Sequence, residues 1–127
     1  MEKQIKQVVE FHKKFGLPVR NTVNVPATKE FMMRHGLIKE ELKEIMEGYK
    51  NNDSTEMVDG IVDLLYVTIG LAVQMGVADK LEQCFDEVQR SNMTKLGEDG
   101  KPVLREDGKI LKGENYSPPN LIKILKP

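Results

Sequence analysis

The stretch Glu56–Met75, EMVDGIVDLLYVTIGLAVQM, decides the fold of this chain. It contains no proline and is apolar almost all the way round, apart from three acidic residues, Glu56, Asp59 and Asp63. The helical period of about 100° per residue places these three within roughly 60° of one another, on one narrow stripe. A helix that is apolar on its other sides is expected in the middle of a bundle, where ionised carboxylates are costly unless something pairs with them.

Amphipathic patterns on both sides of this stretch predict further helices, over about residues 2–15, 29–50 and 78–95. The segment 17–28 contains two prolines and two asparagines and is predicted to be an ordered loop. Asp53 and Glu56 have the spacing of a capping box at the start of the central helix. His12 lies on the apolar face of the first helix, which is more typical of a satisfied core histidine than of a ligand.

The C-terminal part has a different pattern. EDGKPVL at 98–104 is echoed by EDGKILK at 106–112, and Asp107-Gly108 between short apolar runs indicates a β-hairpin. Pro118-Pro119 excludes helix, so the final segment is predicted to be extended. We therefore predict one all-α domain, residues 1–127, with a helical bundle over about 2–95 and a hairpin with an extended tail over about 97–127.

Composition excludes several classes of function. The 127 residues have a net charge of −1, which argues against a nucleic-acid or membrane-surface partner bound by bulk charge. The single cysteine fits a reducing, cytoplasmic location. No apolar run reaches the roughly 18 residues of a membrane span. We expect a cytoplasmic protein with neither a nucleic-acid nor a membrane partner.

The strongest chemical signal is a concentration of acid on two consecutive helices. A short turn joins them, so they are expected to lie antiparallel and to bring together Glu40, Glu41, Glu44, Glu56, Asp59 and Asp63. Like charges at about 4 Å repel by several kcal/mol at an effective dielectric near 20, so either some carboxyls are protonated or a cation is bound. An all-oxygen cluster suits Mg²⁺ or Mn²⁺. The alternative is that the residues from Glu40 to Glu47 form a solvated face and Glu56 only caps its helix.

Basic residues follow the acidic ones, from the segment RSNMTK at 90–95 onward. Mg²⁺ commonly shares substrate phosphates, and Arg and Lys complete phosphate sites, so the order of charges suggests a polyphosphate substrate. The structural alternative is that Arg90, Asn92 and Lys95 pair with the dipole at a helix C-terminus. Tyr116 could stack on a base or fill a groove.

Two acidic motifs resemble a known signature. EELKE at 40–44 followed by EMVD at 56–59 is similar to the EExxE…ExxD pattern of the all-α nucleoside triphosphate pyrophosphohydrolases, which include MazG, the phosphoribosyl-ATP pyrophosphohydrolases and the dimeric dUTPases. The downstream segments EVQRSNMTKL and KGENYSPP resemble the small bacterial and phage branch of this superfamily. The resemblance extends from about Phe11 to Leu121.

This resemblance implies a MazG-like bundle of four to five helices that assembles as a homodimer or tetramer. It implies hydrolysis of a nucleoside triphosphate to the monophosphate and pyrophosphate, with Mg²⁺ as the cofactor and Mn²⁺ as a substitute. Glu40 would orient or deprotonate the attacking water and, with Glu44, carry the catalysis. The implied metal ligands are Glu41, Glu44, Glu56, Asp59 and Asp63. The implied contacts to the nucleotide are Arg90, Asn92, Lys95, Lys112 and Tyr116.

Two other classes of function are compatible with the same residues. One is a non-catalytic nucleotide-binding or regulatory helical module, and the other is a purely structural helical dimer with its acids on the surface. Among substrates, dUTP, dCTP, a damaged nucleotide and phosphoribosyl-ATP are all open.

Overall fold

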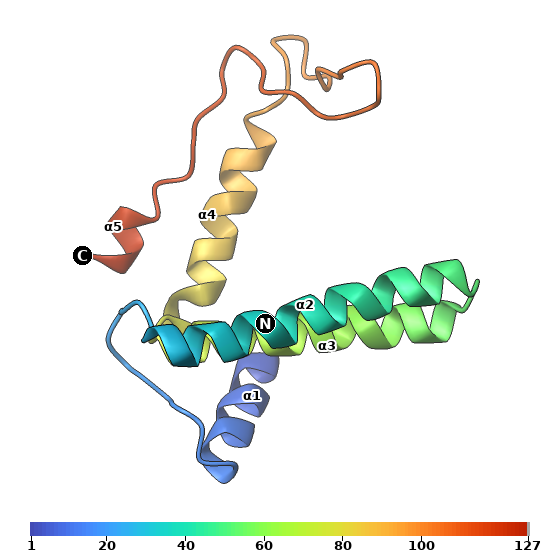
Figure 1. Ribbon diagram of the computed structural model, residues 1–127. Helices are drawn as coiled ribbons and strands as arrows, with labels where there is room; N and C mark the ends of the chain where they lie inside the picture. The colour runs from blue at the N-terminus through green and yellow to red at the C-terminus, as the bar shows by residue number, and fades with distance from the viewer. Residues whose placement is uncertain (127) are drawn as a thin grey trace. The chain divides into compact units, whose positions relative to one another are not determined.

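The computed structural model describes residues 1–126, and within this range every regular element is helical (Figure 1). The elements are α1 (Glu2–Lys14), α2 (Thr28–Lys50), α3 (Ser54–Met75), a 3₁₀ turn η1 (Ala78–Lys80), α4 (Leu81–Met93) and α5 (Ile122–Leu125). The all-α prediction is confirmed. The chain forms two compact units, an N-terminal unit of residues 1–79 and a C-terminal unit from Lys80 onward. The prediction of a single domain stays a prediction.

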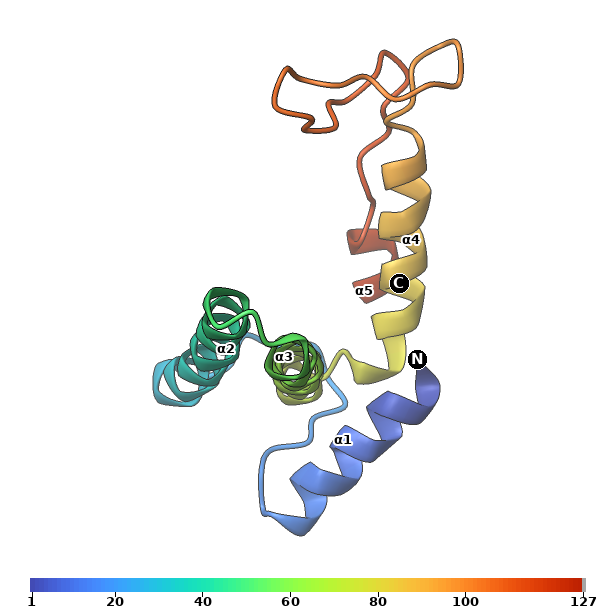
Figure 2. The ribbon, with the colours of Figure 1, turned by 90° about the vertical axis from the view of Figure 1, so that its right-hand side faces the viewer.

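In the N-terminal unit, α3 is the central helix and contacts both α2 and α1. Figure 2 looks nearly along the axes of α2 and α3, which lie side by side as an antiparallel hairpin. The buried apolar core is contributed by Val8 of α1 together with Ile69, Ala72 and Val73 of α3. The most apolar half of the central helix therefore forms the core of this unit, as its composition predicted.

Local signals delimit α3 at both ends. At its N-terminus, the Oδ1 of Asp53 accepts hydrogen bonds from the backbone N–H groups of Thr55 (2.9 Å) and Glu56 (3.1 Å). This confirms the Asp53 half of the predicted capping box and satisfies two backbone donors that a helix start leaves free. The reciprocal half does not form, because the Asp53 N–H donates to the carbonyl oxygen of Gly48 and not to the Glu56 side chain. At its C-terminus, Gly76 adopts a left-handed conformation with φ 73°. Both ends of the helix follow from the residues beside them.

A buried polar cluster joins the three helices of this unit. The Nδ1 of His12 lies 2.9 Å from the carbonyl oxygen of Pro18, and its Nε2 lies 3.3 Å from a guanidinium nitrogen of Arg34. Because a carbonyl only accepts and a guanidinium only donates, the imidazole is neutral and carries its proton on Nδ1. Arg34 also donates to the side-chain oxygen of Gln74, at 3.1 Å. His12 is 1% exposed, so its interpretation as a satisfied core histidine is confirmed.

The C-terminal unit differs from the prediction in two places. The expected β-hairpin is not supported: residues 97–126 contain no strand, only one isolated antiparallel bridge between Leu104 and Ile110. Residues 98–112 are all exposed, so a two-stranded ribbon here has no apolar surface to bury. The final segment is not extended throughout, because α5 forms three residues after Pro119, where the constraint of the prolines no longer applies.

Within residues 1–126, no single helix has the length and apolar composition needed to cross a membrane. In this range, one pair of consecutive helices, Ser54–Met75 and Ala78–Met93, meets that test when the two are counted together, and a bend separates them.

Candidate metal and nucleotide site

The α2–α3 hairpin positions the acidic residues by close packing of its two helices. Gly48 and Gly60 are buried at the contact. A Cβ at Gly48 would lie 2.8 Å from the backbone nitrogen of Met57, and a Cβ at Gly60 would lie 3.1 Å from that of Ile45. Both distances are shorter than ordinary contacts, so the absence of side chains lets the helices approach. This approach brings the acids of the two helices within reach of one another.

Three carboxylates form a close group at this contact: Glu41 and Glu44 of α2, and Asp63 of α3. One ligand atom from each lies within 4.8 Å of the others. Glu41 and Asp63 are half-buried, whereas Glu44 is exposed. Three acceptors at this separation can converge on a single cation.

The electrostatics of the group centre on Glu41. Its Oε2 is buried and has no hydrogen-bond partner among the described residues. Burial raises the pKa of the Glu41 carboxyl above its ordinary value, and the neighbouring negative charges of Glu44 and Asp63 raise it further. A buried acceptor without a donor is costly and is normally satisfied. The all-oxygen donor set and the orphaned oxygen together fit a hard divalent cation such as Mg²⁺.

The other predicted acids lie around this group. Glu40 is exposed on α2 beside Glu41 and adds to the negative charge that raises the pKa of Glu41. Glu56 and Asp59 are not part of the close group. They line a surface groove along the first half of α3, together with Asp53, Val58 and Val62. The Glu56 carboxylate accepts a long hydrogen bond, 3.5 Å, from the side chain of Asn51.

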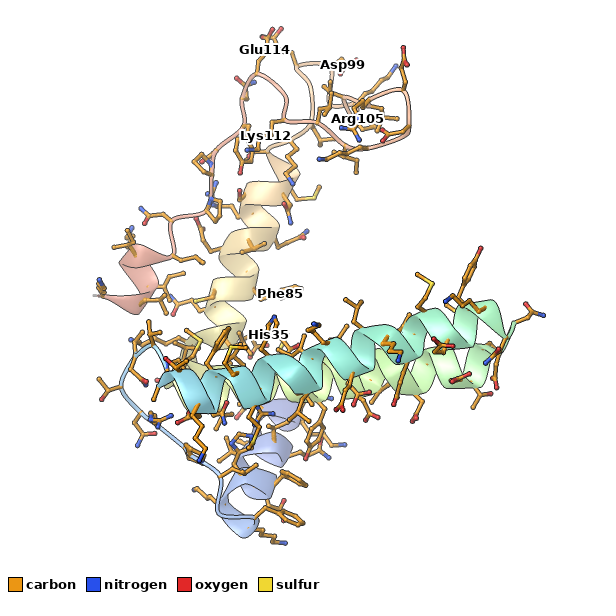
Figure 3. All side chains as sticks on the ribbon, in the orientation of Figure 1. His35, Phe85, Asp99, Arg105, Lys112 and Glu114 are labelled. Carbon is orange, nitrogen blue, oxygen red and sulfur yellow. The ribbon has the colours of Figure 1, made fainter. Side chains whose placement is uncertain are left out.

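The residues predicted to bind substrate all lie in the C-terminal unit. Arg90 and Asn92 are exposed on α4, and Lys95 follows the end of that helix. Lys112, labelled in Figure 3, and Tyr116 lie in the tail. The structure brings these two together: the Lys112 ammonium lies over the Tyr116 ring, 4.7 Å from its centroid. This geometry is a cation–π contact that ties two of the predicted residues into one surface feature. The roles of all predicted site residues stay predictions.

Sequence reasoning missed residues that join the elements within each unit. Glu87, which is paired with Arg90, was not singled out, and neither were Arg34 and Gln74. The i, i+3 spacing of Glu87 and Arg90 was a usable signal for the first pair. For Arg34 and Gln74, which are 40 positions apart, only the fold reveals the contact.

Comparison with known proteins agrees with the acidic motifs. A family model described as phosphoribosyl-ATP pyrophosphohydrolase matches residues 8–92. No curated protein matches the sequence. Among solved structures, the chain is similar to a candidate NTP pyrophosphohydrolase from Exiguobacterium sp. 255-15, at 21% identity over 91% of this chain and 88% of that chain. The TM-score of 0.32 is too low for that likeness to support a conclusion. The family model covers well over half of the sequence, and the chain therefore belongs to the phosphoribosyl-ATP pyrophosphohydrolase family.

Proposed function

We propose that this chain is a Mg²⁺-dependent nucleoside triphosphate pyrophosphohydrolase, which converts a (deoxy)nucleoside triphosphate or related nucleotide to the monophosphate and pyrophosphate. The observation that carries the proposal is the close group of Glu41, Glu44 and Asp63 with its orphaned buried oxygen. Membership of a pyrophosphohydrolase family supports the reaction class. Surface acids without a ligand would be expected to point apart and to stay hydrated, rather than to converge beside a buried acceptor.

The metal would be held by the carboxylates of Glu41, Glu44 and Asp63, with Glu56 and Asp59 as further ligands. Mn²⁺ would be an acceptable substitute, because it accepts the same oxygen donors. When bound, the ion would act as a Lewis acid toward the phosphate oxygens. Binding would also remove the repulsion among the carboxylates, which is why the group tolerates partial burial.

The protein's own groups would carry the proton and hold the substrate. Glu40, which is exposed beside the close group, would take a proton from water as the water oxygen bonds to phosphorus, with Glu44 sharing in the catalysis. The bond between the α- and β-phosphates breaks, and pyrophosphate leaves. Pyrophosphate gains negative charge as it departs. The proposed contacts that bind the nucleotide and stabilise this negative charge are Arg90, Asn92, Lys95, Lys112 and Tyr116.

The function is tested by measuring pyrophosphate release across a panel of nucleoside triphosphates and phosphoribosyl-ATP, with and without Mg²⁺. Glu44→Gln and Asp63→Asn should each abolish most of the turnover, because each removes one anionic ligand without changing the size of the side chain. Asp79→Asn is the matched control, since it removes one exposed carboxylate from the same unit outside the close group. Metal-independent turnover, or full turnover in both site variants, would refute the proposal.

We further propose that two copies of the chain associate, as a dimer or within a tetramer, through α3 in the cytoplasm. Val58, Ile61, Val62 and Leu65 follow one another at helical spacing on α3 and are each about half exposed, between 48% and 57%. A continuous apolar stripe of this kind is typical of an interaction surface, and a second copy would bury it. The partners would then be nucleotide and a second copy, without nucleic acid or membrane.

Sedimentation equilibrium of the wild type and of Val62→Lys tests the association. The wild type should sediment as a dimer or tetramer, and the variant should shift toward the monomer because a lysine puts a charge where two apolar surfaces would meet. Asn21→Lys, at an exposed loop position, adds the same charge elsewhere as a control. A monomeric wild type at high micromolar concentration would overturn this part of the proposal.

A further inference from the structure

Two motifs that are far apart in the sequence contact each other in the C-terminal unit. RSNMTK at 90–95 forms the end of α4, and the segment NYSPPN at 115–120 runs back along it. The hydroxyl of Ser91, which is 2% exposed, donates to the carbonyl oxygen of Ser117 at 2.8 Å. The backbone N–H of Ser117 in turn donates to the Oγ1 of Thr94, also at 2.8 Å. The tail is thus held on the helix by reciprocal hydrogen bonds.

The charged pair of Glu87 and Arg90, which precedes Ser91 on α4, contacts the same tail segment. Arg90 forms a bidentate pair with Glu87 through its Nε (2.8 Å) and one terminal nitrogen (2.9 Å). The two terminal nitrogens of Arg90 also donate to the Ser117 hydroxyl and to the Pro118 carbonyl oxygen, each at 3.2 Å. Glu87 accepts a further bond, 2.8 Å, from the backbone N–H of Asn120. Each member of the pair therefore holds the helix and the tail together.

The ionised state of Glu87 is strongly favoured by these partners. The hydrogen bond from Arg90, followed by the bond from the Asn120 N–H, lowers the pKa of Glu87 to about 2. Its side chain is only 18% exposed, whereas that of Arg90 is 46% exposed. The carboxylate thus stays charged near neutral pH and is held by both the helix and the tail.

A second anchor lies before the segment that carries Tyr116. The backbone N–H of Gly113 donates to the carbonyl oxygen of Lys95 at 3.0 Å. A Cβ at Gly113 would lie 2.8 Å from that oxygen, so only glycine allows the tail to approach the end of α4 this closely. The chain between Gly113 and Ser117 is therefore anchored at both ends, and the Lys112–Tyr116 contact lies at this anchored piece.

We infer that Glu87 and Arg90 are positioning residues, which clamp the tail on α4 and thereby set the placement of Lys112 and Tyr116 for nucleotide. The inference rests on the proposed function, in which those two residues contact substrate. For Arg90 it replaces the direct nucleotide contact proposed above with an indirect role, and it leaves the other proposed contacts unchanged. All three guanidinium nitrogens donate to atoms of the chain, and the Glu87 carboxylate beside them would repel a phosphate.

The experiment compares Glu87→Gln and Arg90→Gln with Asp86→Asn, which removes an exposed carboxylate from the neighbouring position of α4. Amide hydrogen exchange of Ser117 and Asn120 reports the clamp directly, because their N–H groups donate to Thr94 and Glu87. Turnover gives KM and kcat. Binding of a non-hydrolysable nucleoside triphosphate analogue gives an affinity that needs no turnover. Thermal melting checks that each variant folds.

The clamp predicts exchange about tenfold faster at the two amides in both variants, and KM and analogue Kd raised by about three- to tenfold with kcat close to wild type. Asp86→Asn should match wild type throughout. Arg90→Lys separates the two roles of this arginine. A lysine keeps the charge for a phosphate contact but lacks the planar fork for Glu87, so a clamp predicts that it behaves like Arg90→Gln.

Unchanged exchange in Glu87→Gln would overturn the clamp. Faster exchange with unchanged KM and Kd would overturn the positioning role. A raised KM in Arg90→Gln that Arg90→Lys restores, with Glu87→Gln at wild-type KM, would assign Arg90 to direct phosphate contact and also overturn the inference. Absence of turnover in the wild type would refute the proposed function alone, since exchange and analogue binding decide the clamp without it.

Discussion

Replacing Gly60 with alanine would force apart the two helices that carry the acidic group. Gly60 is buried on α3 against α2. A Cβ at this position would lie 2.8 Å from the Cγ1 of Ile45, 3.1 Å from the backbone nitrogen of Ile45 and 3.4 Å from the carbonyl oxygen of Glu41. The Ile45 side chain can rotate, but the backbone nitrogen moves only with α2. The methyl group therefore acts on the helix spacing, directly beside a member of the close group.

The magnitude follows from two opposing effects on the free energy of unfolding. Alanine is favoured over glycine in a helix interior by about 1 kcal/mol. Overpacking a close contact costs about 1–3 kcal/mol, so Gly60→Ala is expected to be destabilising by about 0–2 kcal/mol. Gly36→Ala in α2 is the matched control, because a Cβ there meets nothing within 4 Å and only the favourable effect applies. The difference between the two variants, about 1–3 kcal/mol, isolates the overpacking.

Thermal unfolding by circular dichroism, at one chain concentration and in EDTA, measures this difference. At about 4 °C per kcal/mol for a chain of this size, Gly60→Ala should melt about 4–12 °C below Gly36→Ala. Titration with Mg²⁺ should then raise the Tm of Gly36→Ala as in wild type, and that of Gly60→Ala less, since the ligands on the two helices have separated. Equal Tm values for the two variants would refute the close approach of α2 and α3.

Three further predictions concern titration and capping. Because the pKa of Glu41 is raised, the stability of the metal-free protein should fall as the pH rises above the ordinary glutamate pKa. Thermal melting of Glu41→Gln should show neither this pH dependence nor the Mg²⁺-induced rise in Tm. A pH dependence retained in Glu41→Gln would contradict its assignment to Glu41. Burial, and to a lesser extent the Arg34 charge, lowers the pKa of His12, so stability should be lost as the pH falls below about 6.5, and melting of His12→Gln should lack that loss. Asp53→Ala should lower the free energy of unfolding by about 0.5–2 kcal/mol in urea titrations, whereas Asp53→Asn, which still caps, should cost little.

Several features of the fold could be read from the sequence because their causes are local. The hydrophobic pattern of residues 56–75, with Asp53 before it and Gly76 after it, predicts a buried helix, and α3 has these bounds to within two residues. His12 on an apolar face was identified as part of the core for the same reason. Helical periodicity and the short turn between two successive helices also predicted that their acids would meet, and the two acidic motifs indicated the family that the comparison confirms.

The errors lie where the outcome depends on burial rather than on local preference. Asp107-Gly108 does form a turn, with the Gly108 N–H donating to the Arg105 carbonyl oxygen, but the flanking residues bury no apolar face and pair only at one bridge. Gly48 and Gly60 are weak helix formers when judged from sequence. Only the packed hairpin shows that their missing side chains set the distance between α2 and α3.

The sequence by itself determined the helices, the caps of α3 and the residue types of the acidic group, because these depend on neighbours within one or two turns. The tertiary structure decided which acids converge. Asp63 joins Glu41 and Glu44, while Glu56 and Asp59 stay outside this close group and line a surface groove on the same helix, because the axial offset of two antiparallel helices depends on how they pack. It also decided that the tail lies along α4, because hydrogen bonds between positions 26 to 33 residues apart produce no periodic pattern in the sequence.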